Sequence, residues 1–237
     1  MSNRFFDFGL TFVPPVKLAR DHSSALLVID MQYHDASPDQ GFNLAVDKIQ
    51  PGAMDYFNER TEDIVIPAIR ELLAYFRTHS LPVIYLTLGS DYQDYRDMPP
   101  RSRQWMRDVE LRSGVENIFW SGNPAFAIRK EIEPRPDETV IRKRTMGAFN
   151  SSNLDTYLRD SGMENLVITG ISTNACVETT ARDAADRGWG CIMVADAMAD
   201  YDAEAHEAAL RGFHFNFGRV VGSPEDVIAA MESGTPL

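Results

Sequence analysis

The sequence predicts an α/β fold in three layers: a six-stranded parallel sheet with helices on both of its faces. Three observations predict it. Short apolar runs alternate with amphipathic segments along the chain, which is typical of β–α–β units. The chain has 237 residues, 44% of them apolar, so one core can hold it together without disulfides or a structural metal. There is no internal repeat or low-complexity tract, and we predict a single domain over residues 1–237.

The strands are expected at the apolar runs, because a strand buried on both faces carries few polar residues. They are Ala25–Ile29, Pro82–Thr87, Glu138–Ile141, Asn165–Thr169, Cys191–Ala195 and Arg219–Val221. The helices are expected where apolar residues recur at helical spacing. They are Thr61–Ser80, Asn153–Asp160, Ala175–Arg187, Ala203–Phe215 and Ser223–Met231, the last with Ser223 as N-cap and Pro224 at its first position.

Three segments lie outside this alternation: an N-terminal arm over residues 1–23 and two insertions at about residues 33–58 and 89–137. The second insertion is predicted to be irregular and is rich in Arg, Asp, Pro and aromatic residues. Insertions of this length are usually functional or contact a partner. Because they and the aromatic arm (Phe5–Phe8) would expose much apolar surface, we predict a homo-oligomer.

Charge and cysteine content exclude several classes of protein. The formal net charge is −12, and the densest basic cluster is Arg142–Arg144, so neither nucleic acid nor a membrane surface is an expected partner. No window approaches 18 continuous apolar residues. Two cysteines make no disulfide framework, which indicates a reducing compartment. Without a visible targeting segment, the expected location is the cytoplasm.

Cofactor and metal motifs are absent from the sequence. The turns after the first and fourth strands, Asp30–Tyr33 and Gly170–Asn174, do not carry Gly-x-Gly-x-x-Gly, and no Walker motif occurs, so we expect no nucleotide cofactor. The five histidines show no metal-ligand spacing with one another, and no Asp-x-His occurs, so we expect no metal. A serine hydrolase is not supported either, because there is no Gly-x-Ser-x-Gly.

Three chemically active side chains follow strands at the edge where parallel sheets bind ligands. Cys176 comes after the fourth strand, in the first turn of a predicted helix, where a thiolate is stabilised. Asp30 ends the first strand and is a candidate general acid and base. Lys143 follows the third strand and can balance their charge. Each of the three residues has a structural alternative, as a packing, turn or surface residue. Cys191, at the start of a predicted strand, fits the packing role. The occurrence of all three active residues at one edge of the sheet favours catalysis.

At these residues the sequence resembles the isochorismatase-like cysteine hydrolases. The segments that carry the resemblance are Leu26–Gln32, Ile141–Lys143 with Gly147–Asn150, and Val167–Val177, the last being the most specific. The match runs from about Ser24 to Met231. The resemblance implies a Rossmann-like six-stranded sheet, a catalytic triad and commonly a dimer or tetramer.

Carried onto this chain, the triad is Asp30, Lys143 and Cys176. The family's non-proline cis peptide falls on the Ile171–Ser172 bond, and its oxyanion hole falls on the backbone amides of Ser172 and Cys176.

Four further residues are candidates for substrate binding: Phe149 to pack on the substrate, Gln32 to donate a hydrogen bond near Asp30, and Arg142 and Arg144 to meet a carboxylate. A structural role is an open alternative for each.

The resemblance implies hydrolysis of a C–N bond in a small ureido or carboxamide substrate, through an acyl- or carbamoyl-cysteine. The motifs around Phe149 and Cys176 look most like those of ureidoacrylate, biuret and N-carbamoylsarcosine amidohydrolases, and the missing Asp-x-His argues against a nicotinamidase. Two alternatives stay open: a vinyl-ether hydrolase that uses Asp30 without the thiol, and a non-catalytic protein that binds a metabolite. The sequence does not identify the substrate.

Overall fold

A computed structural model describes residues 12–237 and contains one six-stranded, entirely parallel sheet. The strand order is β3-β2-β1-β4-β5-β6. The strands are β1 (Ser24–Ile29), β2 (Val83–Leu88), β3 (Thr139–Lys143), β4 (Asn165–Ile171), β5 (Gly190–Ala199) and β6 (Arg219–Val221). The predicted sheet is therefore confirmed, and each strand overlaps the apolar run that predicted it.

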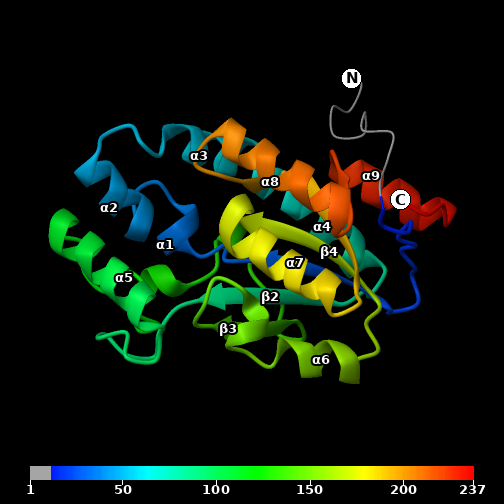
Figure 1. Cartoon of the computed structure of the whole chain (residues 1–237), viewed down its shortest axis with the longest axis horizontal. Helices are drawn as coiled ribbons and strands as arrows, with labels where there is room; N and C mark the ends of the chain where they lie inside the picture. The colour runs from blue at the N-terminus through cyan, green and yellow to red at the C-terminus, as the bar shows by residue number, and fades with distance from the viewer. Residues whose placement is uncertain (1–11) are drawn as a thin grey trace.

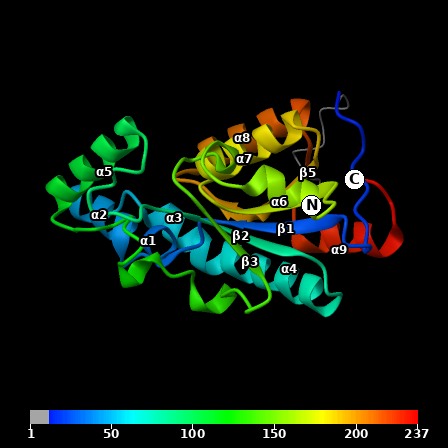
Figure 2. The ribbon, with the colours of Figure 1, turned by 90° about the horizontal axis from the view of Figure 1, so that it is seen from below.

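Helices cover both faces of the sheet, as the alternation predicts (Figures 1 and 2). Helices α6 (Leu154–Asp160), α7 (Glu178–Asp186) and α8 (Ala203–Asn216) pack on one face. Helices α4 (Ile66–Thr78) and α9 (Pro224–Ser233) pack on the other. Alternate residues of β1 join the two cores: Leu27 and Ile29 belong to the first, Leu26 and Val28 to the second. This burial on both faces explains why β1 reads as a continuous apolar run.

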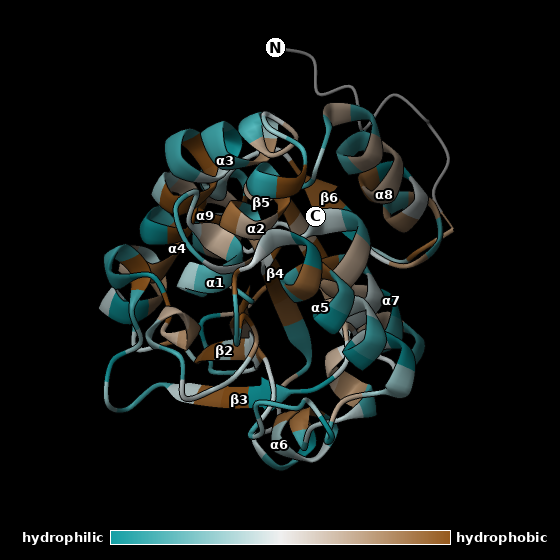
Figure 3. Cartoon of the chain, turned by 90° about the vertical axis from the view of Figure 1, so that its left-hand side faces the viewer, coloured by the Kyte–Doolittle hydropathy of each residue, from teal (hydrophilic) through white to brown (hydrophobic). Residues whose placement is uncertain are grey.

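The two insertions build a wall beyond the carboxyl end of the sheet. The first holds α1 (Tyr33–Ala36), α2 (Gly41–Ile49) and α3 (Asp55–Arg60), and the second holds α5 (Pro100–Ser113). Seen from this end, α1, α2 and α5 lie in front of the strands, and hydrophilic residues cover much of α5 (Figure 3). The expectation that residues 89–137 are irregular was wrong, because they contain α5 and the short 3₁₀ turns Pro124–Phe126 and Lys130–Ile132.

Two helices begin differently from the sequence prediction. The helix expected from Thr61 starts with a π-helical turn, Thr61–Val65, that continues from α3 into α4. The helix expected from Ala175 is preceded by a second π-helical turn, Thr173–Val177, so α7 begins only at Glu178. Cys176 therefore lies in a π-helical turn, a feature found frequently at functional sites.

The described part of the N-terminal arm lies against the end of the chain. Val16 and Leu237 exchange two backbone hydrogen bonds of 2.9 Å each, and the Arg219 side chain donates to the Val13 carbonyl at 2.7 Å. The segment Phe5–Phe8, on which the oligomer prediction partly depends, lies outside the described residues, and that prediction stays untested. No helix of the described chain is long and apolar enough to cross a membrane.

Candidate active site

The strand order brings three distant segments to one edge of the sheet. β1 is central, with β2 and β3 on one side and β4 to β6 on the other, so the chain changes direction between β1 and β4. Ligands of open α/β sheets bind beyond the carboxyl ends at such a switch point. Asp30 directly follows β1, the turn carrying Cys176 follows β4, and Lys143 is the last residue of β3. The predicted placement of these three residues at the ligand edge is thus observed.

Lys143 and Asp30 form a buried ion pair. The Lys143 Nζ lies 2.7 Å from the Asp30 Oδ2, and the two side chains are 0% and 1% exposed. Burial raises the pKa of Asp30, although the charge of Lys143 opposes this shift. Burial lowers the pKa of Lys143, but the charges and hydrogen bonds of Asp30 and Cys176 together outweigh burial, and the net shift is upward. The ammonium is therefore held charged beside a carboxyl group whose proton affinity is increased, as a general acid and base requires.

Cys176 presents its thiol to this pair and to a cavity. The residue is 7% exposed, and it lines the cavity, whereas Asp30 and Lys143 lie behind the wall. Burial raises the pKa of Cys176 well above its usual value; Lys143 opposes the shift and Asp30 adds to it. The resting sulfur is accordingly a neutral thiol, and attack on a substrate requires a base that takes its proton.

The backbone beside the ion pair is specified by a glycine. Asp30 has a φ of +55°, and Gly170, the cross-strand partner of the preceding residue Ile29, has a φ of +114°. A Cβ on Gly170 would lie 2.1 Å from the Ile29 carbonyl oxygen, so only glycine fits there. This close approach brings the end of β1, and with it Asp30, directly against the turn that leads to Cys176.

The turn from residue 172 to residue 177 is held by hydrogen bonds within the turn and by one to the residue that follows β5. The Ile171–Ser172 peptide bond is cis, as the resemblance implies. The Ser172 carbonyl accepts hydrogen bonds from the amides of Ala175 and Val177, both at 3.2 Å. The Asp200 carboxylate at the end of β5 accepts from the Asn174 amide at 2.6 Å.

A second polar network supports the same turn from the side of α8. The Thr173 hydroxyl lies 2.8 Å from the Nδ1 of His206. The other ring nitrogen of His206, Nε2, lies 3.2 Å from the Arg60 guanidinium. Arg60 also donates to the backbone carbonyls of Met198 and Ala195, each at 2.8 Å. These contacts join α3, β5 and α8 to the turn that carries the thiol.

The cavity at Cys176 has a volume of about 320 Å³, within the range of small-molecule sites. Its wall is mainly apolar and aromatic, and most of it comes from the insertions. The lining residues are Asp35, Phe42, Asn43, Phe57, Leu88, Met98, Arg101, Ser102, Trp105, Met106, Phe119, Arg144, Thr145, Met146, Ile171, Ser172, Ala175, Cys176 and Tyr201. Ser172 and Cys176, whose amides are the predicted oxyanion hole, both reach it.

Three of the four residues expected to bind substrate, Gln32, Phe149 and Arg142, are not part of this wall. Gln32 is 0% exposed, and its amide group is engaged with the backbone of Leu88 and Phe126. Phe149 is buried and stacks on Trp189 at a centroid distance of 5.5 Å. Both side chains support the scaffold around the site in this structure.

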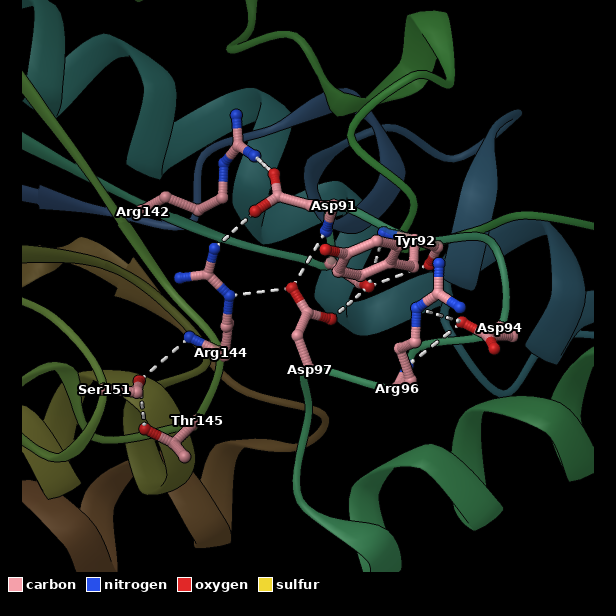
Figure 4. Close-up of polar contacts among 10 residues, drawn as sticks. Asp91, Tyr92, Asp94, Arg96, Asp97, Arg142, Arg144, Thr145 and Ser151 are labelled. Carbon is pink, nitrogen blue, oxygen red and sulfur yellow. Dashed lines mark hydrogen bonds and ion pairs between the residues drawn. The ribbon is translucent and has the colours of Figure 1, made fainter.

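The two arginines are held by carboxylates (Figure 4). Arg144 lies 2.5 Å from Asp91 Oδ2 and 2.8 Å from Asp97 Oδ2, and Arg142 pairs with the other oxygen of Asp91. Arg144 lines the cavity, but these contacts neutralise its charge; Arg142 does not line it. The acidic partners could not be anticipated from the sequence, because they lie about fifty residues away in an insertion without a recognisable pattern.

Other wall residues were not identified from the sequence. Asp35 on α1, Arg101 and Trp105 on α5, and Tyr201 after β5 all line the cavity. In the sequence, Tyr201 could have been identified by its position after a predicted strand. Arg101 and Trp105 could not, because α5 was not recognised as a helix. Among residues 12–237, no group of three or more His, Cys, Asp or Glu side chains is placed to hold a metal ion.

Comparison with known proteins agrees with this architecture. The isochorismatase domain model matches residues 24–225. A ureidoacrylate amidohydrolase of Stutzerimonas stutzeri is 32% identical over 204 residues, covering 83% of this chain and 78% of that protein. One of Methylobacterium radiotolerans is 30% identical over 227 residues, covering 92% and 82%.

Solved structures share the fold. A cysteine hydrolase of Pseudomonas syringae pathovar phaseolicola superposes with a TM-score of 0.77 at 24% identity, covering 94% of this chain and 100% of that one. The N-carbamoylsarcosine amidase of Thermoplasma acidophilum superposes with a TM-score of 0.60 at 25% identity, covering 86% and 97%. With its domain match, its relatives and its sheet in agreement, the chain belongs to the isochorismatase family.

Proposed function

We propose that this protein is a cysteine-dependent amidohydrolase that cleaves a C–N bond of a small ureido or carboxamide substrate through an acyl- or carbamoyl-cysteine. The observation that carries the proposal is the buried Lys143–Asp30 pair, 2.7 Å apart, behind a thiol that faces a cavity. Its family and its amidohydrolase relatives make the chain a hydrolase of C–N bonds. The nucleophile and the class of substrate are the proposed part.

The first half-reaction starts with the thiol. Asp30 takes the proton of Cys176, and the sulfur forms a bond to the substrate carbonyl carbon. The resulting oxyanion accepts hydrogen bonds from the backbone amides of Ser172 and Cys176; in other enzymes the loss of one such donor costs about 3–4 kcal/mol. Asp30 then gives its proton to the nitrogen, the C–N bond breaks, and the amine or ammonia leaves.

The second half-reaction releases the acyl group. Asp30 takes a proton from water, whose oxygen attacks the acyl- or carbamoyl-cysteine, and the same amides hold the second oxyanion. The C–S bond breaks and the sulfur recovers its proton from Asp30. Lys143 stays an ammonium throughout, so it offsets the negative charge that moves between Asp30 and Cys176.

The test is ammonia release from a panel of small ureides, N-carbamoyl amino acids and carboxamides. Cys176→Ala and Asp30→Asn should each lower turnover by more than about a thousandfold, because nucleophile and base act as one unit. Cys191→Ala is the matched control: this thiol is 0% exposed and does not reach the cavity.

Intact mass after rapid quenching should show the wild-type chain heavier by the acyl or carbamoyl group. Full activity of Cys176→Ala would refute the proposal. Turnover of isochorismate that resists iodoacetamide would favour a vinyl-ether hydrolase, and absence of turnover across the panel would favour a binding protein.

A further inference from the structure

The cations of the cavity wall differ in how well they are neutralised. Arg144 is held by Asp91 and Asp97, with the shorter of the two contacts at 2.5 Å (Figure 4). Arg101 also lines the cavity, but within residues 12–237 no carboxylate lies within ion-pair distance of it. A substrate anion would therefore find at Arg101 an exposed positive charge that forms no ion pair within the described residues.

Arg101 lies on the face of α5 that forms the cavity wall. It occupies the first turn of the helix, and Ser102, Trp105 and Met106 line the cavity beside it. Residues four apart are neighbours on a helix surface, which places Arg101 next to Trp105. The Trp105 ring lies 5.3 Å from Phe42 and 5.8 Å from Phe119, measured between centroids. Charge and apolar surface thus adjoin on a single helix.

The thiol end of the cavity carries an acidic side chain in its wall. Asp35 lines the cavity, and its charge adds to the effect of burial on the Cys176 thiol, whereas the opposite charges of Lys143 and Asp30, which are paired with each other, act on the thiol in opposite senses. A substrate carboxylate close to the sulfur would be repelled by Asp35. N–H donors of a ureido or carboxamide group are instead favoured there, since carboxylates accept hydrogen bonds from them.

We infer that Arg101 binds the carboxylate of an anionic substrate whose ureido or carboxamide carbon lies at Cys176, with the intervening carbon chain against Trp105. This inference rests on the proposed function and adds to it a specificity-determining residue, Arg101, which selects for a carboxylate among the small ureido and carboxamide substrates. It also assigns carboxylate recognition to α5. Arg142 and Arg144, which the sequence suggested for this role, are instead paired with Asp91 and Asp97.

The test compares an acid with a neutral molecule of the same shape. 3-Ureidopropanoate and N-(3-methylbutyl)urea differ only in that an isopropyl group replaces the carboxylate. The preference is the ratio of their kcat/KM values, measured for the wild type, Arg101→Ala, Arg101→Lys and the control Arg103→Ala. Arg103 is on the same helix and carries the same charge, but it does not line the cavity.

Arg101→Ala should reduce the preference for the acid by about tenfold through a higher KM, since one charge-assisted hydrogen bond of an exposed arginine is lost. Arg101→Lys should recover part of it, and Arg103→Ala should keep the wild-type value. An Arg101→Ala variant that keeps the wild-type preference overturns the inference while the proposed function stands.

A binding measurement separates this inference from the chemistry. Calorimetric titration of both ureides into Cys176→Ala and into Cys176→Ala/Arg101→Ala needs no turnover. About tenfold weaker binding of the acid to the double variant supports the role of Arg101, even if the wild type hydrolyses neither compound and the proposed function fails. Equal affinities, or no binding of the acid to Cys176→Ala, overturn it.

Discussion

Replacing Lys143 by methionine would remove one half of the buried ion pair while keeping much of the side-chain volume. At 2.7 Å and an effective dielectric constant of about 20, the Lys143–Asp30 attraction is about 6 kcal/mol. Dehydrating the two ions costs several kcal/mol each, so the intact pair is close to balanced. In Lys143→Met the cost of burying Asp30 remains and the attraction is gone. The free energy of unfolding should fall by about 3–5 kcal/mol near pH 8.

The loss should depend on pH in a defined direction. Burial already raises the pKa of Asp30, and removing Lys143 raises it further. A carboxyl group with a raised pKa binds more protons in the folded than in the unfolded state, so its stabilising contribution is complete at low pH and disappears as pH rises through the folded-state pKa. Lys143→Met should therefore recover stability from about pH 8 to about pH 5 relative to the wild type.

Urea denaturation followed by tryptophan fluorescence at both pH values measures these differences. Arg142→Met is the matched control, because its pair with Asp91 has side chains 37% and 44% exposed and should contribute less than about 1 kcal/mol. Asp30→Asn/Lys143→Met should be more stable than Lys143→Met. The reasoning is refuted if Lys143→Met loses no more than the control near pH 8, or loses equally at both pH values.

Three other changes are expected to have measurable effects. Gly170→Ala should destabilise the fold by about 3 kcal/mol in urea denaturation, because its Cβ would lie 2.1 Å from a β1 carbonyl oxygen at a φ of +114°; a loss below about 1 kcal/mol would contradict this. Burial, aided by a neighbouring arginine, lowers the pKa of His206 to about 3. The wild type should therefore lose stability as pH falls below about 6.5, by up to about 5 kcal/mol, and His206→Gln should lack that share of the loss. Iodoacetamide should leave Cys191 unmodified in the native chain, because this residue is 0% exposed, and any adduct should lie on Cys176, which lines the cavity; an adduct on Cys191, found by intact mass and peptide mapping, would contradict this.

The scaffold could be predicted because its strands are buried on both faces. β1 and β2 are buried along their full lengths, and apart from Ser24 and Thr87 their residues are apolar or aromatic. β5 extends to Ala199, beyond the predicted end at Ala195, because Asp196, half of whose side chain is exposed, interrupts the pattern. The prediction therefore ended the strand too early, because a polar residue near the carboxyl end of a strand breaks the apolar pattern although the strand continues past it.

Helix α5 was missed because it buries little. Only Met106 and Val109 are buried along its 14 residues, and most of the remaining positions are polar or charged. The periodic apolar stripe that reveals a helix in a sequence is therefore nearly absent. The wall of the cavity, including Arg101 and Trp105, was invisible for the same reason.

The positions of the catalytic candidates could be predicted from the sequence, whereas the surroundings of the substrate-binding candidates could not. Asp30, Lys143 and Cys176 are placed by parallel strands, whose carboxyl ends share one edge whatever the insertions do. The environments of Arg142 and Arg144 depend on Asp91 and Asp97, in a loop whose path no local pattern fixes. Proximity along the sequence to Lys143 was not evidence of proximity to the substrate.

The separate origins of the thiol and of the wall opposite it have a consequence for substrate choice. Reactive groups are anchored to the ends of strands, whereas α5 is a largely solvated excursion between β2 and β3. Lengthening, shortening or recoding that excursion would leave the two hydrophobic cores almost untouched, because few of its side chains belong to them. Substitutions in this one segment would therefore change which substrate is bound at little cost in folding, while the groups that break the bond stay unchanged.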